Sequence, residues 1–159
     1  MCRKVQAAVA AKSSRHSKDP SFIVCARTDA FSVGGMGEAV DRARRYVAAG
    51  AEMIFPEGLA SRDDFKEFAE AMHSCTTSSN TSLYLMANMT EFGQTDHISV
   101  HEFRELGYDL VVFPVTTLRV AMKAVDTILE VIMNEGTVEG HLETMLPRDE
   151  MYRVLQYDP

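Results

Sequence analysis

Residues 82–93 read SLYLMANMTEFG, an apolar run that stops at an amide and is followed by a hydroxyl and a carboxylate. Three other stretches are similarly apolar: FIVCAR (22–27), EMIFPE (52–57) and YDLVVFPV (108–115). Their apolar residues are nearly continuous and do not alternate with polar ones, which is typical of parallel strands covered on both faces. We therefore predict four parallel strands.

Helical patterns separate these strands. The predicted helices cover residues 37–50, 61–72, 99–107 and 117–136, and an amphipathic helix pattern covers the first twelve residues. The first three predicted strands end at residues 27, 57 and 88, so the unit repeats every 30 or 31 residues. A strand–helix unit of about 30 residues is what a (β/α)8 barrel of ~250 residues requires, although a doubly wound sheet uses similar units.

The composition excludes several classes of partner. The chain has 159 residues and a formal net charge of −7, which suits one domain of ordinary composition. An acidic chain is a poor partner for phosphate backbones, and no apolar run reaches transmembrane length, so we expect no nucleic-acid or membrane partner. The three cysteines are widely spaced and odd in number, which indicates reduced thiols inside a cell.

Polar groups gather where each predicted strand ends. These residues are Arg27, Thr28, Asp29, Glu57, Asn88, Thr90, Glu91 and, at the start of the helix after the fourth strand, Arg119. In a parallel barrel the carboxyl ends of the strands surround the substrate, so we expect a site there. Two arginines favour a carboxylate-rich ligand, because guanidinium pairs with carboxylate through two hydrogen bonds. A glutamate among them suggests metal binding or proton transfer.

Five segments of the chain, in order, resemble the methylisocitrate lyases of the isocitrate lyase and phosphoenolpyruvate mutase superfamily. They are ARTDA (26–30), AAGAEMIFPE (48–57), ANMTEFG (87–93), FPVTTLR (113–119) and TMLPRDEMY (144–152). The resemblance implies a (β/α)8 barrel, of which this chain supplies about half, and a homotetramer in the complete enzyme. It also implies Mg²⁺-dependent retro-aldol cleavage of 2-methylisocitrate to pyruvate and succinate.

The same resemblance assigns substrate-binding residues. The positions that match the family are Arg27, Glu57, Asn88, Thr90, Arg119 and Arg148, and Glu57 is expected near the metal. The family's Ser-Gly-Gly loop, its metal-binding aspartates and its Lys-Arg-Cys-Gly-His loop with the catalytic cysteine have no counterpart in this sequence. We therefore expect no catalytic residue and no metal ligand set in this chain, which is expected to be inactive by itself.

We accordingly interpret residues 1–159 as a single partial domain, the C-terminal half of such an enzyme with its final helices. The ligand is expected to be a tricarboxylate or dicarboxylate, and the location to be the cytoplasm or the mitochondrial matrix. Two other functions remain open: a phosphonomutase or oxaloacetate-type hydrolase of the same superfamily, or a non-catalytic half-barrel that binds a small acid.

Three local features are interpreted as structural. Cys25 lies inside a predicted strand and is expected to be a buried, inert thiol. The segment GGMG (34–37) lacks the spacing of a phosphate-binding loop and is expected to be a mobile loop. The Ser/Thr-rich stretch 73–82 is expected to be a surface loop that faces away from the site.

Overall fold

A computed structural model describes residues 1–14, 21–77 and 82–158 of the chain. Its sheet has four parallel strands in the order β1-β2-β3-β4, which is also their order in the sequence. The strands are β1 (Cys25–Thr28), β2 (Met53–Pro56), β3 (Tyr84–Asn88) and β4 (Leu110–Val112). The predicted partial (β/α)8 barrel with four parallel strands is therefore confirmed.

Helices follow the strands in alternation. They are α1 (Cys2–Lys12), α2 (Phe31–Ala48), α3 (Arg62–Met72), α4 (Val100–Glu105), α5 (Thr116–Glu135), a 3-10 helix η1 (Glu139–Thr144) and α6 (Arg148–Leu155). Two of them begin with reciprocal caps. The Ser61 hydroxyl accepts the Asp64 N–H at 3.1 Å, and the Asp64 carboxylate accepts the Ser61 N–H at 2.9 Å. Ser99 and Glu102 make the same pair of contacts at the start of α4, so both helix starts are fixed by local sequence.

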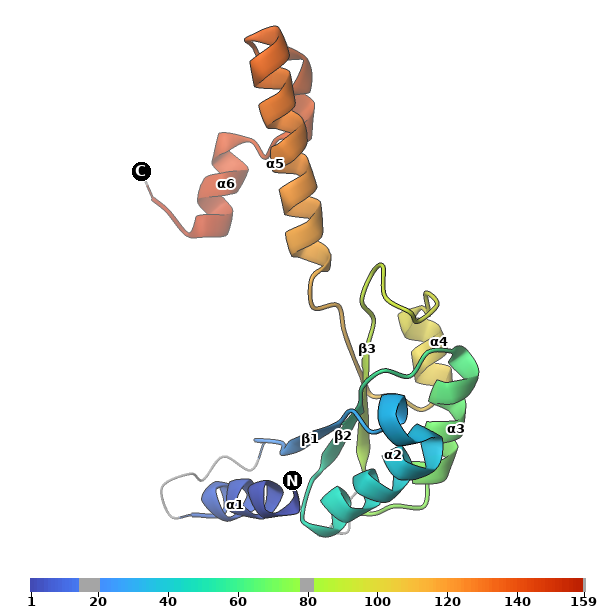
Figure 1. Ribbon diagram of the computed structural model, residues 1–159. Coiled ribbons are helices and arrows are strands. Elements are labelled where there is room, and N and C mark those ends of the chain that lie inside the picture. The colour runs from blue at the N-terminus through green and yellow to red at the C-terminus, as the bar shows by residue number, and fades with distance from the viewer. Residues whose placement is uncertain (15–20, 78–81, 159) are drawn as a thin grey trace. The chain divides into compact units, whose positions relative to one another are not determined.

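The sheet carries α2, α3 and α4 on one face (Figure 1). Residues that alternate along β1 and β3 show which face this is, because Ala26, Leu85 and Ala87 are buried while Cys25 and Tyr84 are exposed. In the described part of the first unit the opposite face is therefore exposed at the starts of β1 and β3, whereas Met53 between them is buried. The expectation that Cys25 is buried is wrong, because Cys25 points to this opposite face and is exposed.

An aromatic cluster holds α3, α4 and the start of β4 together. The rings of Phe65, Phe103 and Tyr108 meet edge to face, with centroids 5.0–5.7 Å apart. The Tyr108 hydroxyl donates to the Phe65 carbonyl at 3.1 Å, so the buried phenol keeps a hydrogen bond. Burial raises the pKa of Tyr108 far above its usual value. The phenol therefore stays neutral, and its ring packs against Phe65 and Phe103.

The segment 34–37 lies within α2, where two helical stretches meet at a kink at Gly35, so the expectation of a mobile loop there is wrong. α2 begins at Phe31, because the N–H groups of Val33 and Gly34 already bond to the Ala30 carbonyl at 3.1 and 2.8 Å. Gly35, with φ 72° and ψ −170°, kinks the helix at a conformation that other residues rarely adopt. The glycines thus bend a helix that the sequence pattern placed six residues later.

Two compact units make up the chain, Met1–Val115 and Thr116–Pro159. The second contains α5, which ends at Gly136 as the sequence predicted, with φ 69° and an N–H bond to the Ile132 carbonyl at 3.0 Å. None of the described helices is long and apolar enough to cross a membrane. In the Ser/Thr-rich stretch Thr76 pairs with Ser82, and residues 78–81 lie outside the described residues.

Glu52 ties the first helix to the sheet. Its carboxylate oxygens lie 2.7 and 2.8 Å from Lys12 Nζ of α1, and one of them accepts the Val24 N–H at 3.1 Å. Partial burial acts to raise the pKa of Glu52, but the hydrogen bonds from Lys12 and Val24 outweigh it and hold the pKa below its usual value. The contact therefore stabilises the fold in the ionised state of the carboxylate.

We predict that Glu52→Gln lowers the free energy of unfolding by roughly 1–3 kcal/mol at neutral pH, because hydrogen bonds to a charged group are lost. The advantage of the native protein should fade as the pH falls below about 4.3, since protonation of a group with a lowered pKa removes its contribution. Urea unfolding at several pH values measures both effects. Glu67→Gln, at an exposed position of α3, is the control, and equal losses in both variants would contradict the prediction.

Candidate functional site

Arg27, Glu57 and Asn88 meet at the carboxyl ends of β1, β2 and β3. Arg27 Nη1 lies 3.5 Å from Glu57 Oε2, and Asn88 Nδ2 donates to Glu57 Oε1 at 3.5 Å. Parallel pairing explains the meeting, because Arg27 is opposite Phe55 and Glu57 follows β2 directly. The prediction that these three side chains emerge at the same end of the sheet is confirmed; their role in binding a substrate stays a prediction.

Asp29 belongs to this cluster although it is absent from the residues that the resemblance assigned. It accepts hydrogen bonds from Arg27 Nε at 3.2 and 3.1 Å and from Arg27 Nη2 at 2.5 Å. These hydrogen bonds lower the pKa of Asp29 and raise the pKa of Arg27, so both groups are charged across the physiological range. The spacing of two residues at a strand end was the signal for this contact, because such side chains leave on the same side.

Thr90 fixes the orientation of Asn88. The Thr90 hydroxyl donates to Asn88 Oδ1 at 2.8 Å, which leaves the amide nitrogen to face Glu57. Asn88 therefore presents an N–H donor to the cluster, and Thr90, another predicted site residue, acts on it directly. An amide donor beside a guanidinium is suited to a ligand carboxylate.

A hollow of about 270 Å³ adjoins the cluster. Its lining residues are Pro56, Glu57, Gly58, Leu59, Phe65, Asn88, Thr90, Gly93, Gln94 and Thr95. Thr95 closes one side, since its hydroxyl donates to the Leu59 carbonyl at 2.7 Å and joins the loop after β3 to the loop after β2. Phe92 in the same loop has φ 60°, a backbone conformation that is rare outside glycine and concentrates at functional sites.

Glu57 alone does not make a magnesium site. Its Oε2 is buried and accepts no hydrogen bond from the described residues, although Arg27 Nη1 lies 3.5 Å away. Mg²⁺, however, takes octahedral oxygen ligands and usually binds through one or two carboxylates together with water and ligand oxygens. No group of three or more His, Cys, Asp or Glu side chains in the described ranges could hold a metal ion. The described residues therefore do not fit Mg²⁺ as a complete site.

Arg119 and Arg148 lie in the second unit. Arg119 is in the first turn of α5, and Arg148 is the first residue of α6. Arg27 belongs to the first unit. That Arg119 and Arg148 bind the same ligand as Arg27 stays a prediction.

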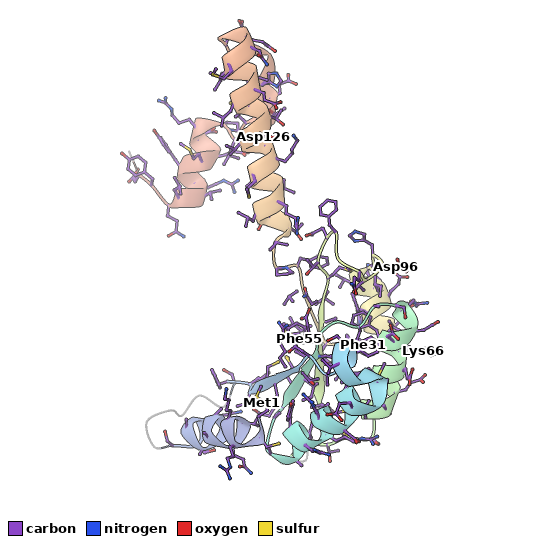
Figure 2. All side chains as sticks on the ribbon, viewed as in Figure 1. Met1, Phe31, Phe55, Lys66, Asp96 and Asp126 are labelled. Carbon is purple, nitrogen blue, oxygen red and sulfur yellow. The ribbon has the colours of Figure 1, made fainter. Side chains whose placement is uncertain are left out.

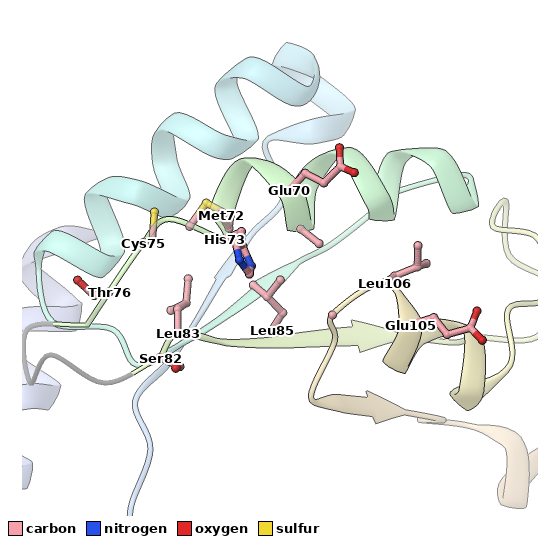
Figure 3. A pocket seen from close by; sticks show the side chains of 12 residues that line it. Glu70, Met72, His73, Cys75, Thr76, Ser82, Leu83, Leu85, Glu105 and Leu106 are labelled. Carbon is pink, nitrogen blue, oxygen red and sulfur yellow. The ribbon is translucent and has the colours of Figure 1, made fainter.

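A larger hollow of about 520 Å³ lies between the ends of α3 and α4 and the start of β3 (Figure 3). Its acidic residues already have basic partners, with Glu70 Oε1 3.9 Å from Lys66 Nζ and Glu105 Oε2 3.4 Å from Arg62 Nη2. It is at the amino end of β3, whereas Asn88 ends that strand. This hollow is therefore separate from the cluster of predicted site residues.

Parallel strands that alternate with helices, with the helices on one face of the sheet, define a partial (β/α)8 barrel. The polar cluster lies at the carboxyl ends of its strands, where the sites of such barrels are found. The sequence profile of the phosphoenolpyruvate phosphomutase family matches residues 1–133. The chain belongs to this family.

Several curated relatives are 2-methylisocitrate lyases or probable 2-methylisocitrate lyases. The chain is 44% identical over 158 residues to the probable 2-methylisocitrate lyase 1 of Corynebacterium glutamicum, covering 99% of this chain and 48% of the relative. It is 43% identical over 157 residues to the 2-methylisocitrate lyase of Aeropyrum pernix, covering 99% and 46%. The chain thus spans about half the length of the curated relatives it matches, and it is a homologue of 2-methylisocitrate lyases.

Solved structures share the fold. A crystal structure of 2,3-dimethylmalate lyase matches with a TM-score of 0.80 and 29% identity, covering 96% of this chain and 49% of that one. Oxaloacetate acetylhydrolase matches with a TM-score of 0.77 and 26% identity, covering 96% and 53%. In both cases the match covers about half of a longer chain, in agreement with four strands of an eight-stranded barrel.

We predict that Thr95→Val loosens the loop after β3. The substitution removes the donor to the carbonyl of buried Leu59, which should cost about 1–2 kcal/mol of unfolding free energy. Amide hydrogen exchange should rise in residues 90–97 more than in the strands. Ser32→Ala, which removes an exposed hydroxyl bond to the Asp29 carbonyl, is the control. Unchanged exchange in the loop of Thr95→Val would contradict the prediction.

Proposed function

We propose that this chain provides substrate-binding groups of a carbon–carbon lyase that cleaves 2-methylisocitrate to pyruvate and succinate by retro-aldol chemistry. The observation that carries the proposal is the contact of Arg27 and Asn88 with one glutamate at the carboxyl ends of neighbouring strands. The 44% identity to a probable 2-methylisocitrate lyase supports this substrate over other acids.

Each residue of the cluster has a distinct task in the proposal. Arg27 binds a carboxylate of the ligand through its guanidinium, and Asn88 donates its amide N–H to a carboxylate oxygen. Thr90 keeps the Asn88 amide in the donating orientation through the 2.8 Å hydrogen bond. Arg119 and Arg148 bind the remaining carboxylates of a tricarboxylate in the complete enzyme.

The proposed lyase uses Mg²⁺, which when bound neutralises and orients ligand oxygens. Glu57, whose Oε2 accepts no hydrogen bond from the described residues, would lie near the ion, and its ligand set would have to come from outside the described residues. In a protein of the relatives' length we expect a homotetramer, located in the cytoplasm or the mitochondrial matrix.

A second candidate is hydrolysis of oxaloacetate or a related mutase reaction. The likeness to oxaloacetate acetylhydrolase, at a TM-score of 0.77, favours it, because an arginine and an amide at the strand ends suit any small dicarboxylate. A third candidate, a non-catalytic half-barrel, binds the acid without converting it.

The test is a fusion of this chain to the part of the Corynebacterium glutamicum relative that this chain does not match. We expect Mg²⁺-dependent release of pyruvate from 2-methylisocitrate, at a higher kcat/KM than for isocitrate, oxaloacetate or phosphoenolpyruvate. The 159-residue chain alone is the control, and we expect it to release no pyruvate.

Each other result selects a different function. A higher kcat/KM for oxaloacetate or phosphoenolpyruvate would replace the lyase by the second candidate. Binding of 2-methylisocitrate by the fusion without any product would favour the non-catalytic half-barrel. Pyruvate release by the 159-residue chain alone would contradict the expected dependence on the part that the relative supplies in the fusion.

Arg119→Lys in the active fusion should lower kcat/KM by about 10- to 150-fold, which is roughly 1.5–3 kcal/mol for a lost charged hydrogen bond. Lysine keeps the charge but loses the planar guanidinium that pairs with a carboxylate through two hydrogen bonds. The thermal unfolding midpoint should change little, because Arg119 is exposed on α5. Steady-state kinetics and a thermal melt decide the matter, and an unchanged kcat/KM would remove Arg119 from the site.

A further inference from the structure

Asp29 occupies one whole edge of the Arg27 guanidinium. The hydrogen bonds from Nε and Nη2 to the Asp29 carboxylate, at 2.5–3.2 Å, are the short contacts of this arginine. Nη1 lies farther from its neighbour, 3.5 Å from Glu57 Oε2. Of the two edges through which a guanidinium can pair with a carboxylate, the Nε/Nη2 edge is therefore filled and the Nη1/Nη2 edge remains.

The guanidinium is also held from a third direction. Its carbon lies 5.4 Å from the ring centroid of Phe55 in β2, which Figure 2 labels. This cation–π contact restricts rotation of the guanidinium plane, while Asp29 restricts its direction within the plane. Together they fix the remaining edge beside Glu57 and Asn88.

We propose that Asp29 is a positioning residue: it holds Arg27 by the Nε/Nη2 edge so that the Nη1/Nη2 edge is presented to a carboxylate of the ligand. The inference rests on the proposed function, because it names how the same site receives its ligand. Asp29 touches Arg27 and is not itself assigned a contact with the ligand.

Glu57 explains why this positioning is needed. Its buried Oε2 accepts no hydrogen bond from the described residues and is an attractive acceptor for the same arginine. Without Asp29, Arg27 is free to turn its Nη1/Nη2 edge fully to Glu57, whose Oε2 already lies 3.5 Å from Nη1. A pair with two short hydrogen bonds between them would use up both the edge that binds the ligand and the Oε2 atom of Glu57.

Positioning and simple electrostatics predict opposite results. Asp29 and Glu57 are negative, so removing Asp29 makes the surroundings of Arg27 less repulsive to an anionic ligand. Electrostatics alone therefore predicts tighter binding of a carboxylate after the substitution. Positioning predicts weaker binding, because the ligand must then compete with Glu57 for Arg27.

The test compares Asp29→Ala and Asp29→Asn in the active fusion protein. We expect Asp29→Ala to raise KM for the carboxylate substrate on the order of 10-fold, the effect of one lost charged hydrogen bond, with kcat changed less than about threefold. Asp29→Asn keeps an oxygen acceptor and should lie between Asp29→Ala and the parent. The matched control is Glu38→Ala, which removes an exposed ion pair with Arg42 on α2, 2.6 Å long, and should leave KM unchanged.

The outcomes decide the inference in either direction. A raised KM with thermal unfolding like that of the control supports positioning, since loss of fold would lower the melting temperature as well. An unchanged or lowered KM in Asp29→Ala overturns it.

A second measurement is independent of the proposed function. In the 159-residue chain, the NMR signal of the Arg27 Nε–H, identified by its loss in Arg27→Lys, should be protected from exchange by Asp29. We expect Asp29→Ala to abolish this protection and Glu38→Ala to retain it. If the fusion acts on no tested acid, the proposed function fails while this measurement still decides the contact, and protection that persists in Asp29→Ala overturns the inference.

Discussion

Parallel pairing of β1, β2 and β3 is the constraint on which the candidate site depends. Arg27 pairs with Phe55, and the pairing continues beyond β2, since the Glu57 N–H donates to the Thr28 carbonyl at 2.9 Å. This alignment brings the side chains that follow each strand to one level. A shift of one residue would turn Arg27 toward the helices and leave Glu57 without its neighbour, because alternate residues of a strand face opposite sides.

The sequence predicted the elements of the fold better than their surroundings. Continuous apolar runs and the caps at Ser61 and Ser99 have local causes, so the four strands and the starts of α3 and α4 were found. Exposure of Cys25 was not, because a nearly continuous apolar run is typical of strands covered on both faces, whereas in the described part of the first unit Cys25 is uncovered. The start of α2 was missed because Gly34 and Gly35 are typical of loops, whereas here they bend a helix.

In the candidate site too, the sequence predicted some residues, whereas other contacts are visible only in the structure. Arg27, Glu57 and Asn88 were recognised because they stand at strand ends, where a repeating strand–helix unit brings polar residues together. The spacing of Asp29 from Arg27 was a signal for their contact, whereas only the path of the loop shows the contact of Thr95 with the Leu59 carbonyl. The described residues at the strand ends therefore include a guanidinium and an amide, groups that can pair with a carboxylate.

The order of the sheet has a consequence for how the chain acquires its structure. Each strand pairs with the strand that follows it in the sequence, so that Cys25 meets Met53, Met53 meets Tyr84 and Met86 meets Leu110. These paired residues are 24 to 31 positions apart in the sequence, which is less than a pairing between strands that are not neighbours in the chain would need, so the entropy cost of loop closure is limited. During synthesis from the N-terminus, each new strand emerges when its neighbour is already available, so the sheet grows by addition at one edge and needs no rearrangement of earlier strands.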